Sequence, residues 1–393
     1  MLSKTPDLFL KAVRSVVGES STLIALHEPS FDHDDWQCVQ KVIESGWVSY
    51  QGSMVQNFEK ALAEYLNEPY VISVVNGTSA LFLALRGLDI AQNDEVLVPS
   101  ITFAATANAV CHVGAIPHFV DVSEKTMGID LEKLDSYLAF HSIFDDKGRL
   151  VNKNTGNPIK AIIPVYIFGA AFDIKQLQFI ASKYNLQIIE DAAEALGSTY
   201  GDQRMSALTG IGILSFNGNK IITTGGGGAI VLKDETLALK IRHLSTTAKK
   251  PHRFEFDHDK IGYNMRLPAL NAALGYSQLK KMDLFLAKKR ELYARYVTCL
   301  NELNIGKMFD PDTYGKSNCW LNAFVLDQGQ KTEKNTILEH LNDNGIAVRP
   351  LWRPLHLLDI YKSSPRSDCS NAENLYERLI CLPSSPSLVK SDE

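Results

Sequence analysis

The chain has 393 residues, of which 45% are apolar and 22% charged, and its formal net charge is −5. This composition is that of a globular protein with a large core, and the length favours two or three domains. A mildly acidic chain has no global attraction to nucleic acid or to an anionic membrane surface, so we expect neither as a partner. Six cysteines without CxxC spacing indicate a reducing compartment. Because the apolar runs are too short to span a bilayer and no secretory signal is evident, we expect a cytoplasmic protein.

From about residue 55 to residue 235, short apolar runs alternate with stretches of helical periodicity. Most of the runs are continuously apolar, which is typical of strands buried on both faces. We expect strands at residues 70–75, 95–98, 116–122, 161–167, 186–189, 212–216 and 229–232, with helices such as 79–88 and 174–184 between them. This βαβ alternation predicts a three-layer α/β domain with a mostly parallel central sheet. Two turn-rich clusters within residues 141–160 interrupt it and predict a surface hairpin or loop.

The two ends of the chain differ from this pattern. In an N-terminal extension at residues 1–25, Leu8, Ala12 and Val16 share helical spacing and predict a peripheral helix. From Pro268, apolar residues at helical spacing up to Tyr293 predict one long helix. A strand at 323–326, a helix at 333–342 that ends before Gly345, and a strand at 346–349 should follow. We therefore expect a large domain at residues 26–267 and a smaller C-terminal α/β domain at residues 268–393.

The first candidate site is the Asn-Gly-Thr-Ser-Ala stretch at residues 76–80, directly after the first strand. A strand, a tight glycine turn and a helix start leave backbone N–H groups free. The hydroxyls of Thr78 and Ser79 add to them, and the combination suits a phosphate. A helix N-cap without a ligand explains the same residues, because serine and threonine favour that position.

The second candidate site is Glu190-Asp191, at the end of the strand at residues 186–189. Ligands of open α/β sheets lie at the carboxyl ends of the strands, where a carboxylate can hold a metal or a protonated ring nitrogen. A second helix N-cap is an equally good interpretation of Asp191.

The third candidate site is Lys220, which follows the strand at residues 212–216 and precedes four glycines at 225–228. Desolvation disfavours the ammonium form of a lysine and makes it a better amine nucleophile for a Schiff base. Consecutive glycines allow the backbone to pass close to another group. A surface lysine before a flexible hairpin is the alternative interpretation.

One cofactor explains all three candidate sites. Pyridoxal 5'-phosphate (PLP) needs a phosphate site, a carboxylate for its pyridinium nitrogen and a lysine for its aldehyde. The sequence contains no GxGxxG motif after the first strand, no GxxxxGK[ST] motif and no HExxH motif. We therefore expect a PLP enzyme in which Lys220 bears the cofactor, with no metal site.

The chain resembles the DegT/DnrJ/EryC1/StrS family of PLP-dependent sugar aminotransferases from about Glu28 to Pro386. That family has the aspartate-aminotransferase fold, known as fold type I. The motifs that carry the resemblance are Gly-Trp-Val-Ser at 46–49, Asn-Gly-Thr-Ser-Ala at 76–80, Phe-Ala-Ala-Thr-Ala-Asn at 103–108, Glu-Asp-Ala-Ala at 190–193, the stretch from Ser215 to Lys220, Thr-Thr-Gly at 223–225 and Gly-Tyr-Asn-Met-Arg at 262–266.

The resemblance implies a role for each matching position. Lys220 carries the cofactor as a Schiff base and later shuttles a proton, and Asp191 pairs with the pyridinium nitrogen. Phe103 stacks on the cofactor ring, and Glu194 lies beside the ring hydroxyl. The phosphate contacts come from Gly77, Thr78, Ser79, Ser215 and, across the interface of a homodimer, Asn264. The substrate contacts are Trp47, Asn217 and Arg266.

Two positions depart from the family pattern. Position 194 is Glu where many members have Gln or His, a difference that bears on donor or substrate preference. Position 217 is Asn where His or Tyr is common. The dehydratase branch of the family replaces the Schiff-base lysine with His. This chain keeps Lys220, which favours an aminotransferase.

The stretch at residues 215–220 is most similar to the branch that acts on UDP-4-keto-6-deoxy-N-acetylhexosamine, in legionaminic acid or bacillosamine biosynthesis. The implied reaction is ping-pong transfer of an amino group from L-glutamate to C4 of the keto sugar. Its product is a 4-amino-4,6-dideoxy sugar nucleotide for surface polysaccharide biosynthesis. Two alternatives stay open, namely another fold-type-I PLP enzyme that acts on amino acids and a non-catalytic PLP-binding relative.

Overall fold

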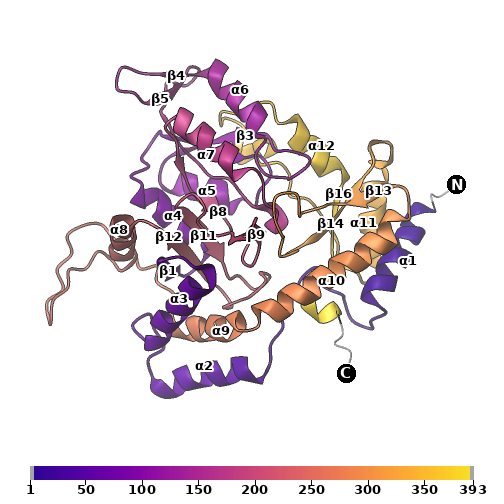
Figure 1. Cartoon of the computed structure of the whole chain (residues 1–393), viewed down its shortest axis with the longest axis horizontal. Coiled ribbons are helices and arrows are strands. Elements are labelled where there is room, and N and C mark those ends of the chain that lie inside the picture. The colour runs from indigo at the N-terminus through magenta and orange to yellow at the C-terminus, as the bar shows by residue number, and fades with distance from the viewer. Residues whose placement is uncertain (1–3, 390–393) are drawn as a thin grey trace.

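The computed structural model describes residues 4–389, and a twisted sheet lies at its centre (Figure 1). Two four-stranded sheets, ordered β1-β12-β11-β8 and β3-β2-β6-β7, join side by side because β7 and β8 follow each other along one stretch of chain. The strands are β1 (Tyr70–Val74), β2 (Glu95–Pro99), β3 (Ile116–Val120), β6 (Ile159–Ile162), β7 (Gln187–Ile188), β8 (Glu190–Asp191), β11 (Ile211–Ser215) and β12 (Gly228–Leu232). Each strand predicted in this region therefore overlaps a strand of the structure.

The pairing of these strands is parallel except at β12. The β2–β3, β2–β6, β6–β7 and β8–β11 pairs are parallel, whereas β12 runs antiparallel to both of its neighbours, β1 and β11. The prediction of a mostly parallel sheet is confirmed. Because β1, β8 and β11 run in the same direction, their carboxyl ends meet at one edge, the edge where ligands of such sheets bind.

Helices cover both faces of the sheet and bury a separate apolar core on each. One face packs against α4 (Gly77–Gly87), α5 (Ala105–His112) and α8 (Glu235–Ser245). The other face packs against α3 (Ser53–Leu66), α6 (Leu131–His141), α7 (Ile174–Lys183) and α9 (Ala269–Leu279), and α2 (His33–Ser45) packs on α9. The result is the three-layer α/β arrangement predicted from the sequence.

Two hairpins and a short helix complete this region. The predicted hairpin within residues 141–160 is present as the antiparallel pair β4 (Ser142–Phe144) and β5 (Leu150–Asn152). A second hairpin pairs β9 (Thr199–Tyr200) with β10 (Gln203–Arg204), and η1 (Ile167–Gly169) is a short 3-10 helix. Residues 161–162 of the strand predicted at 161–167 belong to β6, and η1 begins at its last residue.

The C-terminal part builds a second, antiparallel sheet in the order β13-β14-β16-β15. The predicted strand at 323–326 is β14, and the predicted helix at 333–342 is α11. The predicted strand at 346–349 contributes only its last residue to β15. The elements are α10 (Met282–Asn301), β13 (Gly306–Met308), β14 (Asn322–Leu326), η2 (Gln328–Gln330), α11 (Glu333–Asp343), β15 (Arg349–Pro350), η3 (Leu355–Leu357), η4 (Asp359–Tyr361), α12 (Ser370–Arg378), β16 (Leu379–Leu382) and η5 (Pro386–Leu388).

The N-terminal helix α1 (Thr5–Val17) packs against α10 and α11 of this C-terminal part (Figure 1). The predicted helix is present, and of the three residues that predict it Val16 is buried and Ala12 packs against the same core. Phe9 and Val13 are fully buried and Val16 nearly so, whereas Leu8 is 53% exposed. The stripe that contains the aromatic side chain faces the core because it buries more apolar area.

The single long helix predicted after Pro268 is wrong, because the chain turns between α9 and α10 at Lys280 and Lys281. The Lys281 ammonium binds Asp32 at 2.7 Å and Asp35 at 2.6 Å. Asp32 is also the N-cap of α2, where its side chain accepts two backbone N–H groups. An ion pair with a helix far away in the sequence therefore accompanies the break.

A buried ion pair between Glu59 and Arg266 connects α3 to the segment that precedes α9. The Arg266 guanidinium donates to Glu59 at 2.6 Å and to the Ser73 carbonyl at 3.1 Å. Glu59 also accepts the backbone N–H of Ser73 and a guanidinium N–H of Arg242. The side chains of Arg266 and Glu59 are 7% and 8% exposed.

No helix among residues 4–389 is long and apolar enough to cross a membrane.

We predict that Arg266→Met destabilises the fold by about 1–3 kcal/mol, because the buried Glu59 carboxylate loses one of its two guanidinium partners and keeps only Arg242. Urea unfolding of the purified protein measures this change. The control is Lys60→Met on the same helix, where the Lys60 side chain is 79% exposed and lies 3.8 Å from Glu64. An exposed pair of this kind contributes about 0–1 kcal/mol. Equal stability of the two variants would contradict the structural role of Arg266.

Candidate active site

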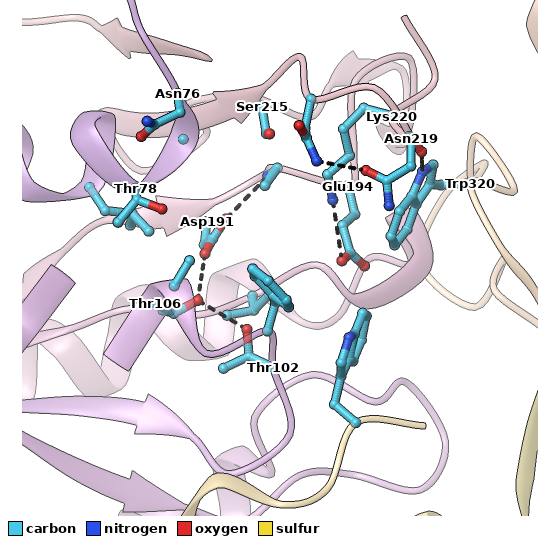
Figure 2. A pocket seen from close by; sticks show the side chains of 18 residues that line it. Asn76, Thr78, Thr102, Thr106, Asp191, Glu194, Ser215, Asn219, Lys220 and Trp320 are labelled. Carbon is cyan, nitrogen blue, oxygen red and sulfur yellow. Dashed lines mark hydrogen bonds and ion pairs between the residues drawn. The ribbon is translucent and has the colours of Figure 1, made fainter. Parts of the chain in front are cut away.

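A cavity of about 370 Å³ lies at the carboxyl edge of the sheet, where β1, β8 and β11 end. Eight of the residues predicted from the sequence line it together, namely Gly77, Thr78, Phe103, Asp191, Glu194, Ser215, Asn217 and Lys220. Figure 2 shows Asp191 between two groups of side chains, with Asn76 and Thr78 on one side and Glu194, Lys220 and Trp320 on the other.

The first group surrounds the N-terminus of α4. The Asn76 side chain caps this helix by accepting the backbone N–H of Ser79 at 2.7 Å. The backbone N–H groups of Gly77 and Thr78 have no acceptor among residues 4–389. Together with the hydroxyls of Thr78 and Ser215, they form a set of donors at the positive end of a helix, which suits a phosphate. The site therefore fits the phosphate of PLP.

Glycine is required where the turn at residues 76–78, called the phosphate turn below, meets β12. A Cβ atom at Gly228 would lie 2.6 Å from the Asn76 carbonyl carbon and 2.7 Å from the Gly77 nitrogen, both backbone atoms. By contrast, a Cβ atom at Gly226 would meet nothing within 4 Å. Of the four consecutive glycines, Gly228 thus permits a close approach of two backbones next to the candidate phosphate site.

Asp191 lies at the end of β8 and is 4% exposed. Its carboxylate accepts the Thr106 hydroxyl at 2.8 Å and the Ala193 backbone N–H at 3.2 Å. Thr106 in turn is 3.0 Å from the Thr102 hydroxyl. Burial raises the pKa of Asp191, and the hydrogen bonds from Thr106 and Ala193 act against that rise. A buried carboxylate of this kind can hold a cationic ring nitrogen.

Lys220 follows β11 in a tight turn, in which its backbone N–H donates to the Asn217 carbonyl at 3.0 Å. The Lys220 ammonium lies 3.9 Å from the centre of the Trp320 ring and 3.6 Å from the Glu194 carboxylate (Figure 2). The indole N–H of Trp320 donates to the Asn219 carbonyl at 2.7 Å. Trp320 belongs to the C-terminal part of the chain, so that part supplies one wall of the cavity.

Glu194 is the second buried carboxyl group of the cavity, with 5% exposure. Its Oε2 atom accepts the backbone N–H of Phe168 at 2.9 Å. Burial raises the pKa of Glu194 to about 7, and the positive charge of Lys220 acts against that rise. Lys220, Asp191 and Glu194 thus form one cluster of ionisable groups, a frequent feature of active sites.

Four of the predicted site residues do not line this cavity. The Ser79 amide is occupied by the Asn76 cap, and Arg266 is held by Glu59. Trp47 is 62% exposed and lines a different hollow, together with residues such as Lys41 and Met54. Asn264 is exposed in the segment between α8 and α9. The predicted roles of Trp47 and Asn264 therefore depend on what lies outside this one chain.

The sequence analysis did not name ten of the residues that line the cavity, among them Asn76, Thr106, Trp320 and Trp352. Asn76 and Thr106 lie within the motifs at 76–80 and 103–108, so those motifs carried a signal that could have identified them. Trp320 and Trp352 have no such signal, because they reach the cavity from a distant part of the chain.

We predict that Gly228→Ala destabilises the protein by about 1–3 kcal/mol, because the new methyl group forces the backbones of β12 and the phosphate turn apart. The same variant should bind PLP more weakly. The control Gly226→Ala should change stability by less than about 0.5 kcal/mol. Urea unfolding and PLP titration of both variants measure these effects. If Gly228→Ala behaves like the control, the close approach is not a constraint on the site.

Comparison with known proteins identifies the family. The family of DegT/DnrJ/EryC1/StrS aminotransferases matches residues 29–393. GDP-perosamine synthase of Escherichia coli O157:H7 is 34% identical over 93% of this chain and 94% of its own length. Among solved structures, Helicobacter pylori PseC, an aminotransferase of pseudoaminic acid biosynthesis, is 28% identical with a TM-score of 0.83, covering 92% of this chain and 94% of PseC. Spr1654 of Streptococcus pneumoniae, solved in a PLP form, is 25% identical with a TM-score of 0.83, covering 94% and 95%. The chain therefore belongs to the DegT/DnrJ/EryC1/StrS family and is a PLP-dependent sugar aminotransferase of fold type I.

Proposed function

We propose that the enzyme transfers an amino group from L-glutamate to C4 of a nucleotide-linked 4-keto-6-deoxy sugar, namely UDP-2-acetamido-2,6-dideoxy-hexos-4-ulose. The product is a 4-amino-4,6-dideoxy sugar nucleotide, made in the cytoplasm for surface polysaccharides. The observation that carries the proposal is the single cavity that gathers Lys220, Asp191 and the free amides of α4. The similarity of residues 215–220 to the UDP-sugar branch supports the choice of acceptor.

The residues of the cavity divide into three proposed binding roles. The Gly77 and Thr78 amides with the Thr78 and Ser215 hydroxyls hold the cofactor phosphate, and Asp191 holds its ring nitrogen. Phe103, which is 60% exposed in this single chain, offers an aromatic face for the ring. When bound, PLP supplies an aldehyde carbon for the amino group and an electron-withdrawing ring.

The protein groups contribute attachment, proton transfer and exclusion of water. Lys220 attaches the cofactor through Nζ, and the same atom later accepts and returns the proton that moves during amino transfer. Asp191, fixed by Thr106 and the Ala193 amide, keeps the ring nitrogen protonated. Trp320 and Trp352 cover the side of the cavity that faces the C-terminal sheet, and their apolar rings keep bulk water from Lys220.

We further propose that the active form is a homodimer in which Asn264 reaches the phosphate in the neighbouring cavity. Asn264 is exposed and lies outside its own cavity. The segment between α8 and α9 protrudes from the rest of the chain (Figure 1), and its Phe254 and Phe256 side chains are each 73% exposed. Exposed aromatic side chains of this kind mark surfaces that another molecule covers. Trp47 and Asn217 then have room to contact the sugar nucleotide, whereas Arg266 has little support as a substrate contact.

A GDP-linked keto sugar is a second candidate for the acceptor. The observation in its favour is the relative named GDP-perosamine synthase, which matches 93% of this chain at 34% identity. Family membership favours either sugar over the amino-acid substrates and the non-catalytic role that the sequence left open.

We predict that L-glutamate bleaches the absorption band of the lysine-bound cofactor, and that UDP-4-keto-6-deoxy-N-acetylhexosamine restores it. The panel should include the corresponding GDP- and dTDP-linked 4-keto-6-deoxy sugars. Restoration by the GDP sugar alone would assign the second candidate. If glutamate bleaches the band but none of the three sugar nucleotides restores it, the proposed acceptor is overturned and the cofactor chemistry stays intact.

We predict that Lys220→Ala loses covalent attachment of the cofactor and all turnover, and that Asp191→Asn lowers kcat by about 10²- to 10³-fold through loss of the ring-nitrogen partner. The matched controls are Lys183→Ala and Asp135→Asn, which break an ion pair of 2.7 Å in which both side chains are more than one third exposed. These controls should leave kcat within about twofold, since exposed pairs contribute little. Borohydride reduction with mass spectrometry locates the attachment, and a glutamate-dependent assay measures kcat. Near-normal turnover in Asp191→Asn would refute its role.

A further inference from the structure

Trp320 contacts the Lys220 side chain at both of its ends. At the base, the indole N–H of Trp320 donates at 2.7 Å to the carbonyl of Asn219, which belongs to the peptide bond that leads into Lys220. At the tip, Lys220 Nζ lies over the Trp320 ring, 3.9 Å from its centre (Figure 2). A lysine has a flexible four-carbon stem, so a contact at one end alone leaves the other end free to move. The two contacts together restrict where Nζ can lie.

The backbone of Trp320 is itself held from two sides. Its N–H donates to the Asn318 side chain at 2.9 Å, and its carbonyl accepts the Lys289 ammonium at 3.0 Å. Lys289 is fully buried and also donates to the Ser384 carbonyl at 2.6 Å. A buried ammonium is costly unless its acceptors stay in place, so Lys289 opposes a shift of the Trp320 backbone. Trp320 is therefore a rigid wall of the cavity.

The ring contact suits a cationic nitrogen. The face of an indole ring attracts a cation that lies within about 6 Å of the ring centre. Glu194 Oε1 lies 3.6 Å from Nζ, so a carboxylate and a ring act on the same nitrogen, and the Lys220 side chain is only 13% exposed to competing water. Condensation of the Lys220 ammonium with an aldehyde forms a carbon–nitrogen bond and releases the aldehyde oxygen as water with two of the ammonium protons. The nitrogen stays protonated, so the charge that the ring attracts is kept.

We propose that Trp320 is a positioning residue for Lys220. Its indole N–H fixes the turn that carries the lysine, and its ring face holds the cationic Nζ where it reacts. This inference rests on the proposed function, because it requires that Lys220 carries the cofactor. It goes beyond a wall that excludes water, since any large apolar side chain excludes water, whereas both contacts need an aromatic ring with an N–H donor.

The test separates covalent attachment from binding. Pyridoxine 5'-phosphate has an alcohol in place of the aldehyde of PLP, so its Kd measures the integrity of the site without a bond to Lys220. The rate at which saturating PLP becomes fixed to Lys220 of the apoenzyme, read by borohydride reduction and mass spectrometry, measures the position of Nζ. Trp320→Leu loses both contacts. Its Kd for the analogue should stay within about twofold of the wild type, and its attachment rate should fall by about 10- to 10²-fold, because a slightly misplaced group reacts much more slowly.

Two further variants complete the series. Trp320→Phe keeps a ring for Nζ but lacks the N–H donor, so attachment should slow by about 3- to 10-fold, the value of one hydrogen bond. The matched control is Trp36→Leu, the same chemical change on α2, where the Trp36 side chain is 63% exposed and does not line the cavity. It should alter neither the analogue Kd nor the attachment rate.

A wild-type attachment rate in Trp320→Leu would overturn the proposal. So would a loss of analogue affinity as large as the loss of rate, because Trp320 would then only support the wall. If Trp320→Leu does not fold, Trp320→Phe decides, and attachment at the wild-type rate in that variant would overturn the positioning role. If the wild type attaches no PLP at Lys220, the proposed function fails and this inference with it. If PLP is attached but no sugar accepts the amine, only the proposed acceptor fails.

Discussion

The antiparallel insertion of β12 between β1 and β11 sets the spacing of the whole site. Val74 at the end of β1 and Ser215 at the end of β11 both pair with Gly228 at the start of β12. The phosphate turn after β1 and the lysine turn after β11 are therefore held on either side of one residue. Since Gly228 has no side chain, the two turns approach closely enough to face one ligand.

The strands and the converging site could be predicted because both depend on short stretches of sequence. Continuously apolar runs identify buried strands, and a polar residue directly after a parallel strand lies at the ligand-binding edge. Lys220, Asp191 and Thr78 were found in this way and line one cavity. By contrast, the antiparallel direction of β12 depends on how its neighbours pair, which no local pattern encodes.

The errors share a physical origin, since each depends on a contact between distant parts of the chain. The break between α9 and α10 accompanies the ion pairs of Lys281 with Asp32 and Asp35. The side of α1 that is buried depends on the surface offered by α10 and α11. Trp320 reaches the cavity because Asn318 donates to the carbonyls of Glu194 and Leu196. Helical periodicity alone contains none of this information.

The same contacts give the two buried carboxyl groups of the cavity different partners. Asp191 accepts two hydrogen bonds, from Thr106 and the Ala193 amide, and these favour its charged form. Glu194 accepts only one, from the Phe168 amide, and otherwise depends on Lys220. The Asn318 side chain donates to the Glu194 carbonyl and so holds the backbone from which this carboxyl group extends. Asp191 therefore holds its charge through hydrogen bonds, whereas Glu194 depends on the positive charge of Lys220, so a change at that lysine affects the two carboxyl groups differently.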